Sequence, residues 1–418
     1  MRFLYWFSLR FYGILIRFDT LFSKKAKDFI TGRKKQVEIL HNLDELPTSR
    51  VWFHFPSLGE FEQGRSVLEK WKEDFPEDQI IITFFSPSGY NARKDYTLAS
   101  RVLYLPLDSP NNARRMVDAI RPRMAFFTKY DFWYYYIREL RERKIPIYFI
   151  SAIFRRNQIY FKPWGSFFRS ILKNISWFFV QDSASMELLE SIGLKNISIT
   201  GDTRFDRVLA ISKKPKDLPE LESFVKGFSV LVVGSSWPRD EEYIHTLLNQ
   251  PFLEGWKCIL VPHEVDSVHL QKIEDIFGGH CLRYSHFLSN SPKKEPGNFT
   301  KVIIIDQIGL LSSIYKIADI AYIGNGFGSG IHNCLEAAIF GKPVIFGPNY
   351  KKFKEARDLI EKKAAFSYLN PMELMEIFKM LLDLEKRQKA GNLARNYCLE
   401  HTGATHKIVE KVLSLSSF

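Results

Sequence analysis

The sequence predicts an α/β protein with two Rossmann-like, doubly wound domains that face a central cleft. Three observations support this fold class: the length, the alternation of strand-like and helix-like segments, and one polar break between two such series. At 418 residues, 45% hydrophobic and 25% charged, the chain has the composition of a folded protein and is too long for one ordinary core. In such folds ligands bind at the carboxyl ends of the parallel strands, so we expect the functional residues there.

The first series begins at Val51, where short β-branched or aromatic runs start to alternate with longer segments of helical period. Strands are expected at 51–55, 80–85, 124–128, 146–151, 177–181 and 196–200. Helices are expected at 60–72, 112–120, 132–143 and 184–192. This alternation is typical of βαβ units on a parallel sheet.

The second series follows a polar, proline-containing break at Ser212–Leu218, which we interpret as the linker. Strands are expected at 228–233, 257–261, 302–306, 320–323 and 343–346, and helices at 240–249, 265–276, 309–317, 333–340 and 355–362. The domains are therefore predicted at 45–211 and 219–390. The final segment, 391–418, is predicted to be a helix that packs back on the first domain.

The amino-terminal segment 1–35 carries much of the excess positive charge. It holds nine bases and two acids, a net of +7 out of +12 for the whole chain. Arg10 and Arg17 interrupt its apolar run, so neither a membrane span of about 20 residues nor a secretory signal fits. We expect an amphipathic helix that lies on an anionic membrane surface. The alternative is an ordinary helix packed on the protein's own core. Nucleic acid is not expected as a partner, because no zinc finger or helix-turn-helix signature is present.

The sequence shows neither a disulfide pattern nor a metal-binding motif. The four cysteines, Cys258, Cys281, Cys334 and Cys398, show neither paired nor metal-ligand spacing, which fits a reducing compartment. No Asp-x-Asp pair stands out, so no metal ion is expected in the reaction.

The first candidate site follows the first expected strand, at Ser57-Leu58-Gly59-Glu60. Gly59 permits a tight turn, and Glu60 then lies at the positive end of a helix dipole, which suits a general base. The alternative is a glutamate that only caps the helix. Ser88 and Asp131 also follow first-domain strands and are predicted to line the cleft with Ser57 and Gly59.

The second candidate site is the glycine-rich stretch from Gly324 to Glu336, between a strand and a helix. Such a loop presents backbone N–H groups to a phosphate, and Glu336 can accept hydrogen bonds from ribose hydroxyls. A purely structural turn is the alternative. Further donor-binding candidates follow other strands. The complete predicted donor set is Ser235, Ser236, His263, Gly328, Ser329, Gly330, Asn333 and Glu336.

Together these residues resemble the Kdo transferases of lipopolysaccharide synthesis, which transfer 3-deoxy-D-manno-octulosonic acid (Kdo) from CMP-Kdo to a lipid A precursor. The resemblance covers about Trp52 to Ala365. Its most specific parts are Ser57–Glu60, Ser86-Pro87-Ser88-Gly89, Tyr104-Leu105-Pro106-Leu107-Asp108, and His332-Asn333-Cys334-Leu335-Glu336 followed by Phe340-Gly341-Lys342-Pro343.

The resemblance implies a GT-B glycosyltransferase that is inverting and metal-independent, with Glu60 as the catalytic base. It implies an acceptor domain at 45–211 and a nucleotide-sugar donor domain at 219–390. It also implies CMP-Kdo as a co-substrate with no cofactor, lipid IVA as the acceptor, and a location at the cytoplasmic face of the bacterial inner membrane, peripheral or amino-terminally anchored. Two alternatives are kept: another GT-B nucleotide-sugar enzyme with a lipid-linked acceptor, and a non-catalytic membrane adaptor.

Overall fold

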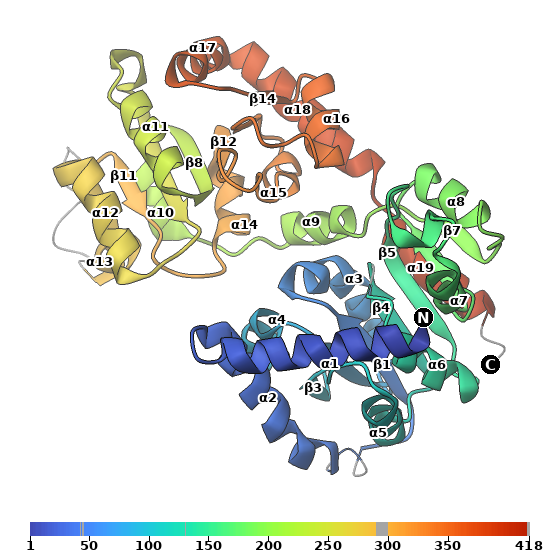
Figure 1. The fold of residues 1–418 in the computed structure, drawn as a ribbon. Coiled ribbons are helices and arrows are strands. Elements are labelled where there is room, and N and C mark those ends of the chain that lie inside the picture. The colour runs from blue at the N-terminus through green and yellow to red at the C-terminus, as the bar shows by residue number, and fades with distance from the viewer. Residues whose placement is uncertain (42, 44–45, 130, 290–299, 416–418) are drawn as a thin grey trace. The chain divides into compact units, whose positions relative to one another are not determined.

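The computed structural model describes residues 1–418 except 42, 44–45, 130, 290–299 and 416–418. The chain divides into two compact units (Figure 1). Unit 1 comprises Met1–Arg207 and Thr402–Phe418, and unit 2 comprises Val208–His401.

Unit 1 contains a seven-stranded parallel sheet in the order β3-β2-β1-β4-β5-β6-β7. Strands β1 and β4 are adjacent at its centre, so the chain reverses its direction of progress across the sheet there. Their carboxyl ends are therefore the expected place for a ligand. The strands are β1 Arg50–Phe55, β2 Gln79–Phe84, β3 Arg101–Tyr104, β4 Met124–Thr128, β5 Ile147–Ala152, β6 Trp177–Val180 and β7 Ile197–Ile199.

Helices cover both faces of this sheet (Figure 1). One face packs against α3 and α19, and the other against α5, α6, α7 and α8. The central strands β1, β4 and β5 are almost entirely buried, which is why they read as continuous apolar runs. The helices are α3 Leu58–Asp74, α4 Pro87–Arg93, α5 Pro110–Ile120, α6 Tyr134–Glu142, α7 Ser166–Leu172, α8 Ser183–Glu190, α9 Arg204–Lys213 and α19 Ala404–Leu415.

Two further helices, α1 (Arg2–Asp19) and α2 (Lys24–His41), precede the sheet. The amino-terminal helix is thus present, although its expected place on a membrane is not confirmed. Gly13 is the buried residue of α1, and Tyr5 and Trp6 pack against the core of unit 1. Within the described residues, no helix is both long and apolar enough to cross a membrane.

Unit 2 repeats the architecture with a parallel sheet in the order β10-β11-β9-β8-β12-β13-β14. Its strands are β8 Ser229–Ser236, β9 Trp256–Pro262, β10 Cys281–Arg283, β11 Val302–Ile304, β12 Ile320–Ile323, β13 Val344–Phe346 and β14 Ala365–Ser367. Its helices are α10 Pro219–Val225, α11 Pro238–Leu248, α12 Ser267–Phe277, α13 Tyr284–Ser289, α14 Leu311–Ile314, α15 Leu335–Ala338, α16 Lys354–Glu361, α17 Pro371–Leu382 and α18 Leu384–Glu400. Helices α11, α12 and α17 supply much of its buried core. The expectation of two Rossmann-like sheets is therefore confirmed.

The boundaries differ in detail from those expected. The division falls between Arg207 and Val208, inside α9, and the chain returns to unit 1 at Thr402 instead of 391. Helix α18 runs unbroken through 390–391, and the break comes at Gly403, whose φ of 102° is accessible mainly to glycine. Asp206 fixes this return by accepting hydrogen bonds from the amides of Gly403 (2.5 Å) and Thr405 (2.6 Å).

Candidate functional site

The first-domain motif lies where β1 ends and α3 begins. Ser57 is the N-cap of α3, and its hydroxyl oxygen accepts from the Gly59 amide at 3.2 Å. The same hydroxyl donates to the Glu60 carboxylate. Ser57 therefore serves both as the helix cap and as a support that orients Glu60 at the first turn of the helix.

Lys129, directly after β4, is the partner of Glu60. Its Nζ lies 3.2 Å from Glu60 Oε1, and the two side chains are 22% and 15% exposed. Lys129 has a φ of 63°, a left-handed conformation that is uncommon outside glycine and asparagine and is often found at functional sites. The ion pair positions a carboxylate that still reaches solvent, which is the arrangement a general base requires.

Asp202 and Arg204 add to the charges around Lys129. Burial by itself would raise the pKa of Asp202, but the ion pair with Arg204 and the charge of Lys129 outweigh burial and lower that pKa. Two hydrogen bonds join the Arg204 guanidinium to Asp202 Oδ2, at 2.8 Å from Nε and 2.7 Å from Nη2. The carboxyl ends of β1 and β4 and the segment after β7 thus bring acidic and basic side chains together.

Asp131 is held by a buried histidine. His54, on β1, is fully buried, with Nε2 3.3 Å from Asp131 Oδ2 and Nδ1 2.8 Å from Thr83 Oγ1. Trp133 Nε1 donates to the same Asp131 oxygen at 3.2 Å. The carboxylate is therefore fixed from two sides at the end of β4.

Ser88 lies in the first turn of α4. The oxygens of Ser86 and Ser88 are 2.6 Å apart, and the Ser88 amide donates to Ser86 Oγ at 3.2 Å. A Cβ on Gly89 would lie 3.1 Å from the backbone nitrogen of Leu58, so glycine permits α4 to approach the start of α3. This contact brings the Ser86–Gly89 motif beside the Ser57–Glu60 motif.

In unit 2, the last residues of β8 form a β-bulge, where the register with β9 shifts between Gly234 and Ser236. A Cβ on Gly234 would lie 1.9 Å from the Tyr315 hydroxyl, and Ser235 has a φ of 53°. The hydroxyl of Ser236 is buried and donates to Glu241 at 2.8 Å. The Ser236 hydroxyl is therefore engaged in the interior, whereas Ser235 is the bulged residue at the carboxyl end of the strand.

Three aromatic rings cluster beside this bulge. The His263 ring stacks on both Trp237 and His332, with ring centroids 5.1 Å and 4.4 Å away. Trp237 Nε1 donates to His332 Nε2 at 3.2 Å. Burial, together with the neighbouring His263, lowers the pKa of His332 to about 4. His332 is therefore neutral at pH 7, and its other nitrogen carries the proton.

The glycine-rich loop after β12 joins the same region. The Gly324 amide donates to the carbonyl of Gly234 at 2.9 Å, which joins the start of this loop to the carboxyl end of β8. Gly330 has a φ of 128°, and Lys352 Nζ donates to the carbonyl of Ser329. The Gly328 amide is bonded within the loop, to the carbonyl of Asn325 at 3.0 Å. The loop is thus compact, with Lys352 at its edge.

Asn333 and Glu336 contact each other, since Asn333 Nδ2 donates to Glu336 Oε1 at 3.1 Å. The expected helix at 333–340 is shorter than predicted, because α15 spans only Leu335–Ala338. The Asn333 side-chain oxygen instead accepts a hydrogen bond from the Leu335 amide at 3.1 Å. The phosphate-binding expectation therefore depends on loop amides and side chains, because a four-residue helix has little dipole.

The sequence places these candidates at strand ends. It also points to Lys129, two residues before Asp131, and to His332, inside the glycine-rich stretch, although neither belongs to the predicted site set. Asp202, Arg204, Trp237 and Lys352 were not expected. Trp237 directly follows Ser236, so adjacency was an available signal. No group of three or more His, Cys, Asp or Glu suited to a metal ion is found among the described residues.

Comparison with known proteins finds the similarity to Kdo transferases that the sequence motifs indicated. Residues 24–207 match the family model described as 3-deoxy-D-manno-octulosonic-acid transferase (kdotransferase). The 3-deoxy-D-manno-octulosonic acid transferase of Rickettsia bellii is 25% identical over 374 residues, 87% of each chain. That of Haemophilus influenzae is 23% identical over 409 residues, covering 95% of this chain and 94% of the relative.

The fold is shared with solved structures. UDP-GlcNAc 2-epimerase from Neisseria meningitidis superposes with a TM-score of 0.61 at 16% identity, over 87% of this chain and all of that one. MurG of Acinetobacter baumannii gives 0.55 at 12% identity, over 88% and 99%. These structural similarities identify the fold as GT-B. The similarity to named 3-deoxy-D-manno-octulosonic acid transferases identifies the class of protein as glycosyltransferase. The resemblance to Kdo transferases is confirmed: the chain carries their amino-terminal family domain and is similar to them over most of its length.

Proposed function

We propose that this protein transfers Kdo from CMP-Kdo to a lipid A precursor, lipid IVA, with inversion and without a metal ion. The observation that carries the proposal is Glu60, a solvent-reaching carboxylate held by Ser57 and Lys129 inside the segment that matches the Kdo transferase family. CMP-Kdo is a co-substrate, and we propose no cofactor.

The reaction is a single displacement. Glu60 takes the proton from an acceptor sugar hydroxyl while that oxygen forms a bond to the anomeric carbon of Kdo. The bond between this carbon and the phosphate oxygen breaks, and its electron pair leaves with CMP. Because one displacement occurs at the carbon, its configuration inverts.

Unit 2 supplies candidate groups for the donor. The end of β8 and the loop after β12 are joined through Gly234 and Gly324, and both lie at the carboxyl end of their sheet. We assign the leaving phosphate to backbone amides around Ser235 and Ser329–Gly330, and the ribose to Asn333 and Glu336. His263, on the exposed side of the stack with His332, is placed to donate to a phosphate or carboxylate.

The acceptor and the location follow from the amino-terminal end. Helix α1 exposes large apolar side chains, among them Phe3 (70% exposed), Phe7 (55%) and Phe18 (65%). A face of this kind, with nearby arginines and lysines, suits the headgroup region of an anionic membrane. We therefore place the protein at the cytoplasmic face of the bacterial inner membrane, where a lipid acceptor is available.

A donor screen tests the proposal. Purified full-length protein is incubated with tetraacylated lipid A precursor and either freshly generated CMP-Kdo or UDP-GlcNAc, and the products are measured by mass spectrometry. We expect acceptor heavier by one or more Kdo units and one CMP released for each, with UDP-GlcNAc unchanged. Consumption of UDP-GlcNAc instead would indicate another nucleotide-sugar enzyme of this fold.

A further inference from the structure

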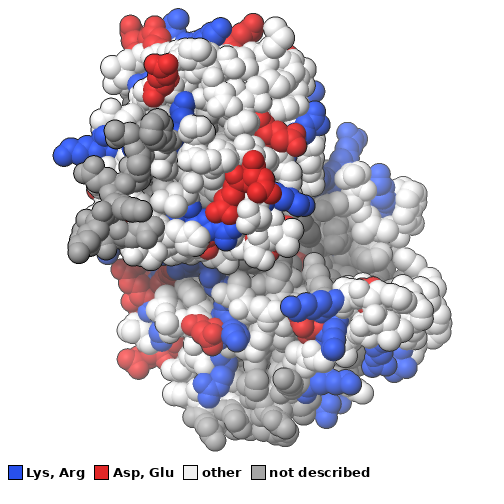
Figure 2. Space-filling view, turned by 90° about the vertical axis from the view of Figure 1, so that its left-hand side faces the viewer, with Lys and Arg blue, Asp and Glu red and all other residues white. Residues whose placement is uncertain are grey.

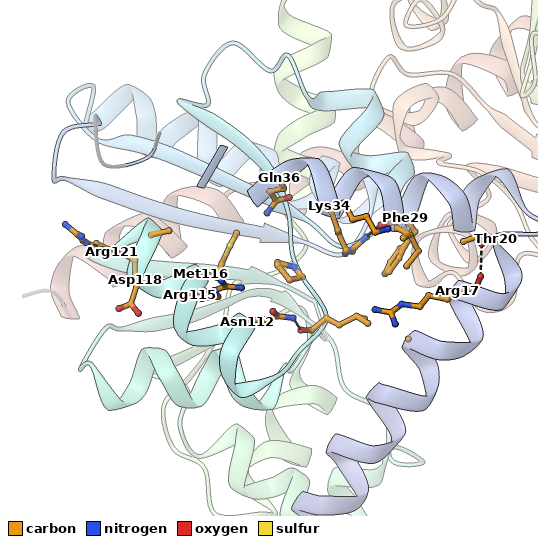
Figure 3. Close-up of a pocket in the computed structure, with 16 residues that line it drawn as sticks. Arg17, Thr20, Phe29, Lys34, Gln36, Asn112, Arg115, Met116, Asp118 and Arg121 are labelled. Carbon is orange, nitrogen blue, oxygen red and sulfur yellow. Dashed lines mark hydrogen bonds between the residues drawn. The ribbon is translucent and has the colours of Figure 1, made fainter. Parts of the chain in front are cut away.

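A large groove in unit 1 lies between α1, α2 and α5 (Figure 3). Its volume is about 1080 Å³, the size of a pocket for a sizeable organic ligand. Most of the exposed lining is carbon. The apolar side chains that the argument uses are Phe29, Ile30, Pro106, Leu107, Met116 and Ala119.

The walls of this groove are held by buried polar contacts. On one side the Tyr5 hydroxyl of α1 donates to Asp108 at 2.6 Å. On the other, the Gln36 side chain of α2 makes two 2.6 Å hydrogen bonds with the backbone of Tyr104. Gly13 lets α1 approach closely, since a Cβ there would lie 3.0 Å from Leu107. The groove is therefore a built feature of the unit and not a gap beside a loose helix.

The rim of the groove carries positive charge from all three helices. Arg17 comes from α1, Lys34 from α2 and Arg115 from α5, and Figure 3 shows Arg17 extending from α1 toward α5. Each of the three is exposed, and none has an ion-pair partner among the described residues.

The groove's acidic residue does not compensate this charge. Asp118 pairs with Arg143 at 2.8 Å. The lining holds two further bases: Arg33 donates to the carbonyl oxygens of Leu105 (3.0 Å) and Phe85 (2.6 Å), and Arg121 donates to the Asp118 carbonyl (3.0 Å). An apolar groove with three uncompensated cations at its rim is complementary to a ligand with a hydrocarbon tail and an anionic head.

The neighbouring surface indicates where such a ligand would come from. The lower right of Figure 2 shows uncharged surface with Lys and Arg side chains around it. The exposed apolar residues of α1 are followed, just after the helix, by Leu21 (73% exposed) and Phe22 (78%). Exposed apolar surface of this extent marks contact with an apolar phase, here a lipid layer.

We propose that this groove binds one anionic phospholipid. An acyl chain lies along Phe29, Leu107 and Met116, and the phosphate is held by Arg17, Lys34 and Arg115. Neither Glu60 nor Asp131 lines the groove, so the site is separate from the transfer chemistry and the inference goes beyond the proposed function. Bound lipid would fix α1 and α2 together at the membrane surface.

A water-soluble lipid separates this site from general attraction to a charged bilayer. Monomeric dihexanoylphosphatidylglycerol, below its micelle concentration, is titrated into the full-length protein by calorimetry. We expect one lipid bound per protein, and binding of dihexanoylphosphatidylcholine at least about five-fold weaker because it lacks the net negative charge. Inorganic phosphate at equal concentration should displace neither lipid. No saturable binding of the phosphatidylglycerol would overturn the proposal.

Two adjacent arginines of α5 provide the matched comparison. Arg115 lines the groove, whereas Arg114 is exposed but does not. Arg115→Gln should weaken lipid binding about five-fold, the equivalent of about 1 kcal/mol, and Arg114→Gln should leave it unchanged. Equal effects of the two substitutions would show diffuse surface attraction and refute the groove.

A second variant tests the apolar part. Ala119→Phe adds a ring on the groove side of α5 and should abolish binding, while an unchanged melting temperature confirms that the unit still folds. Transfer assayed in detergent should be the same for Arg115→Gln and the unsubstituted protein, since the groove takes no part in the chemistry. If lipid A precursor displaces the phosphatidylglycerol and Arg115→Gln reduces detergent transfer, the groove is an acceptor site and the phospholipid assignment is wrong.

Discussion

Replacing Tyr5 by phenylalanine should loosen the amino-terminal helix, and the size of the effect should depend on pH. Asp108 is only 2% exposed and accepts the Tyr5 hydroxyl at 2.6 Å and the amides of Tyr135 and Tyr136 at 3.0 and 3.1 Å. Burial raises the pKa of Asp108 from 3.8 to about 6, although these hydrogen bonds oppose the rise. The carboxylate is therefore ionised in the folded protein above about pH 6.

The raised pKa of Asp108 determines how the stability of the folded protein, and the cost of Tyr5→Phe, depend on pH. In the folded protein the Asp108 carboxyl keeps its proton up to about pH 6, whereas in the unfolded chain it loses the proton near pH 3.8. The stabilisation that comes from proton binding to Asp108 is therefore complete below pH 3.8 and is lost as the pH rises to about 6. A rise of roughly two units corresponds to about 3 kcal/mol. Above pH 6 the Tyr5 hydroxyl bonds to an ion, and its loss should cost about 2 kcal/mol; at pH 5, with Asp108 largely neutral, it should cost about 1 kcal/mol.

Hydrogen exchange of the α1 amides measures this directly, because a terminal helix opens locally without unfolding the unit. Tyr5→Phe is compared with Tyr12→Phe, the same change on the same helix at a side chain 43% exposed. At pH 8 the first variant should exchange about 30-fold faster than the second, and at pH 5 about five-fold. Equal exchange in the two variants, or an effect independent of pH, would refute the role of the buried Asp108.

Further predictions concern the two units separately. Gly234→Ala should lower the stability of unit 2 by about 1–3 kcal/mol in thermal melting, since its Cβ would meet the Tyr315 hydroxyl at 1.9 Å; Tyr315→Phe in the same chain should recover part of this loss. Lys129→Gln should reduce transfer by about 10- to 100-fold with CMP affinity unchanged, because the cation 3.2 Å from Glu60 orients the base; an equal loss of CMP affinity would argue against this role. The ring of His332 should titrate near pH 4 by NMR, since its pKa is lowered to about 4, and a midpoint above pH 6 would contradict the buried, neutral assignment.

The parts of the fold that the sequence could predict were those with long apolar runs. The central strands, such as β1 and β8, are six and eight residues of nearly continuous burial; β1 was expected to within one residue, and β8 to within one residue at its start and three at its end. Strands β3, β10 and β14 were not expected. They have only four, three and three residues and, unlike the equally short β11 and β13, they are only partly buried, so they lack a continuous apolar run.

The candidate site shows the same division. Glu60 and His263 could be selected because each follows a strand, a property of the local sequence. The pairing of Glu60 with Lys129 could not be predicted, because the contact joins segments 69 residues apart. The hydrogen bond between Trp237 and His332, which both stack on His263, likewise joins segments 95 residues apart. Spacing in the sequence carries no information about which strand ends are neighbours until the sheet order is known.

The helix expected at 333–340 is shorter for a different reason. At its start the Leu335 amide donates to the Asn333 side chain, and at its end the amides of Phe340 and Gly341 donate to the carbonyls three residues before them, at Ala337 and Ala338. The four-residue α15 remains. A donor phosphate bound here, as we propose, would therefore meet the loop amides and not a helix dipole.

The central claim is that Glu60 is the base of a Kdo transfer, and a comparison of two glutamates on α3 tests it most directly. Transfer from CMP-Kdo to the lipid A precursor is measured for Glu60→Gln and for Glu62→Gln, with CMP affinity measured in parallel. We expect Glu60→Gln to lower transfer by about 100- to 10,000-fold with CMP affinity unchanged, and Glu62→Gln to transfer normally. Transfer by Glu60→Gln at the rate of Glu62→Gln would contradict the assignment.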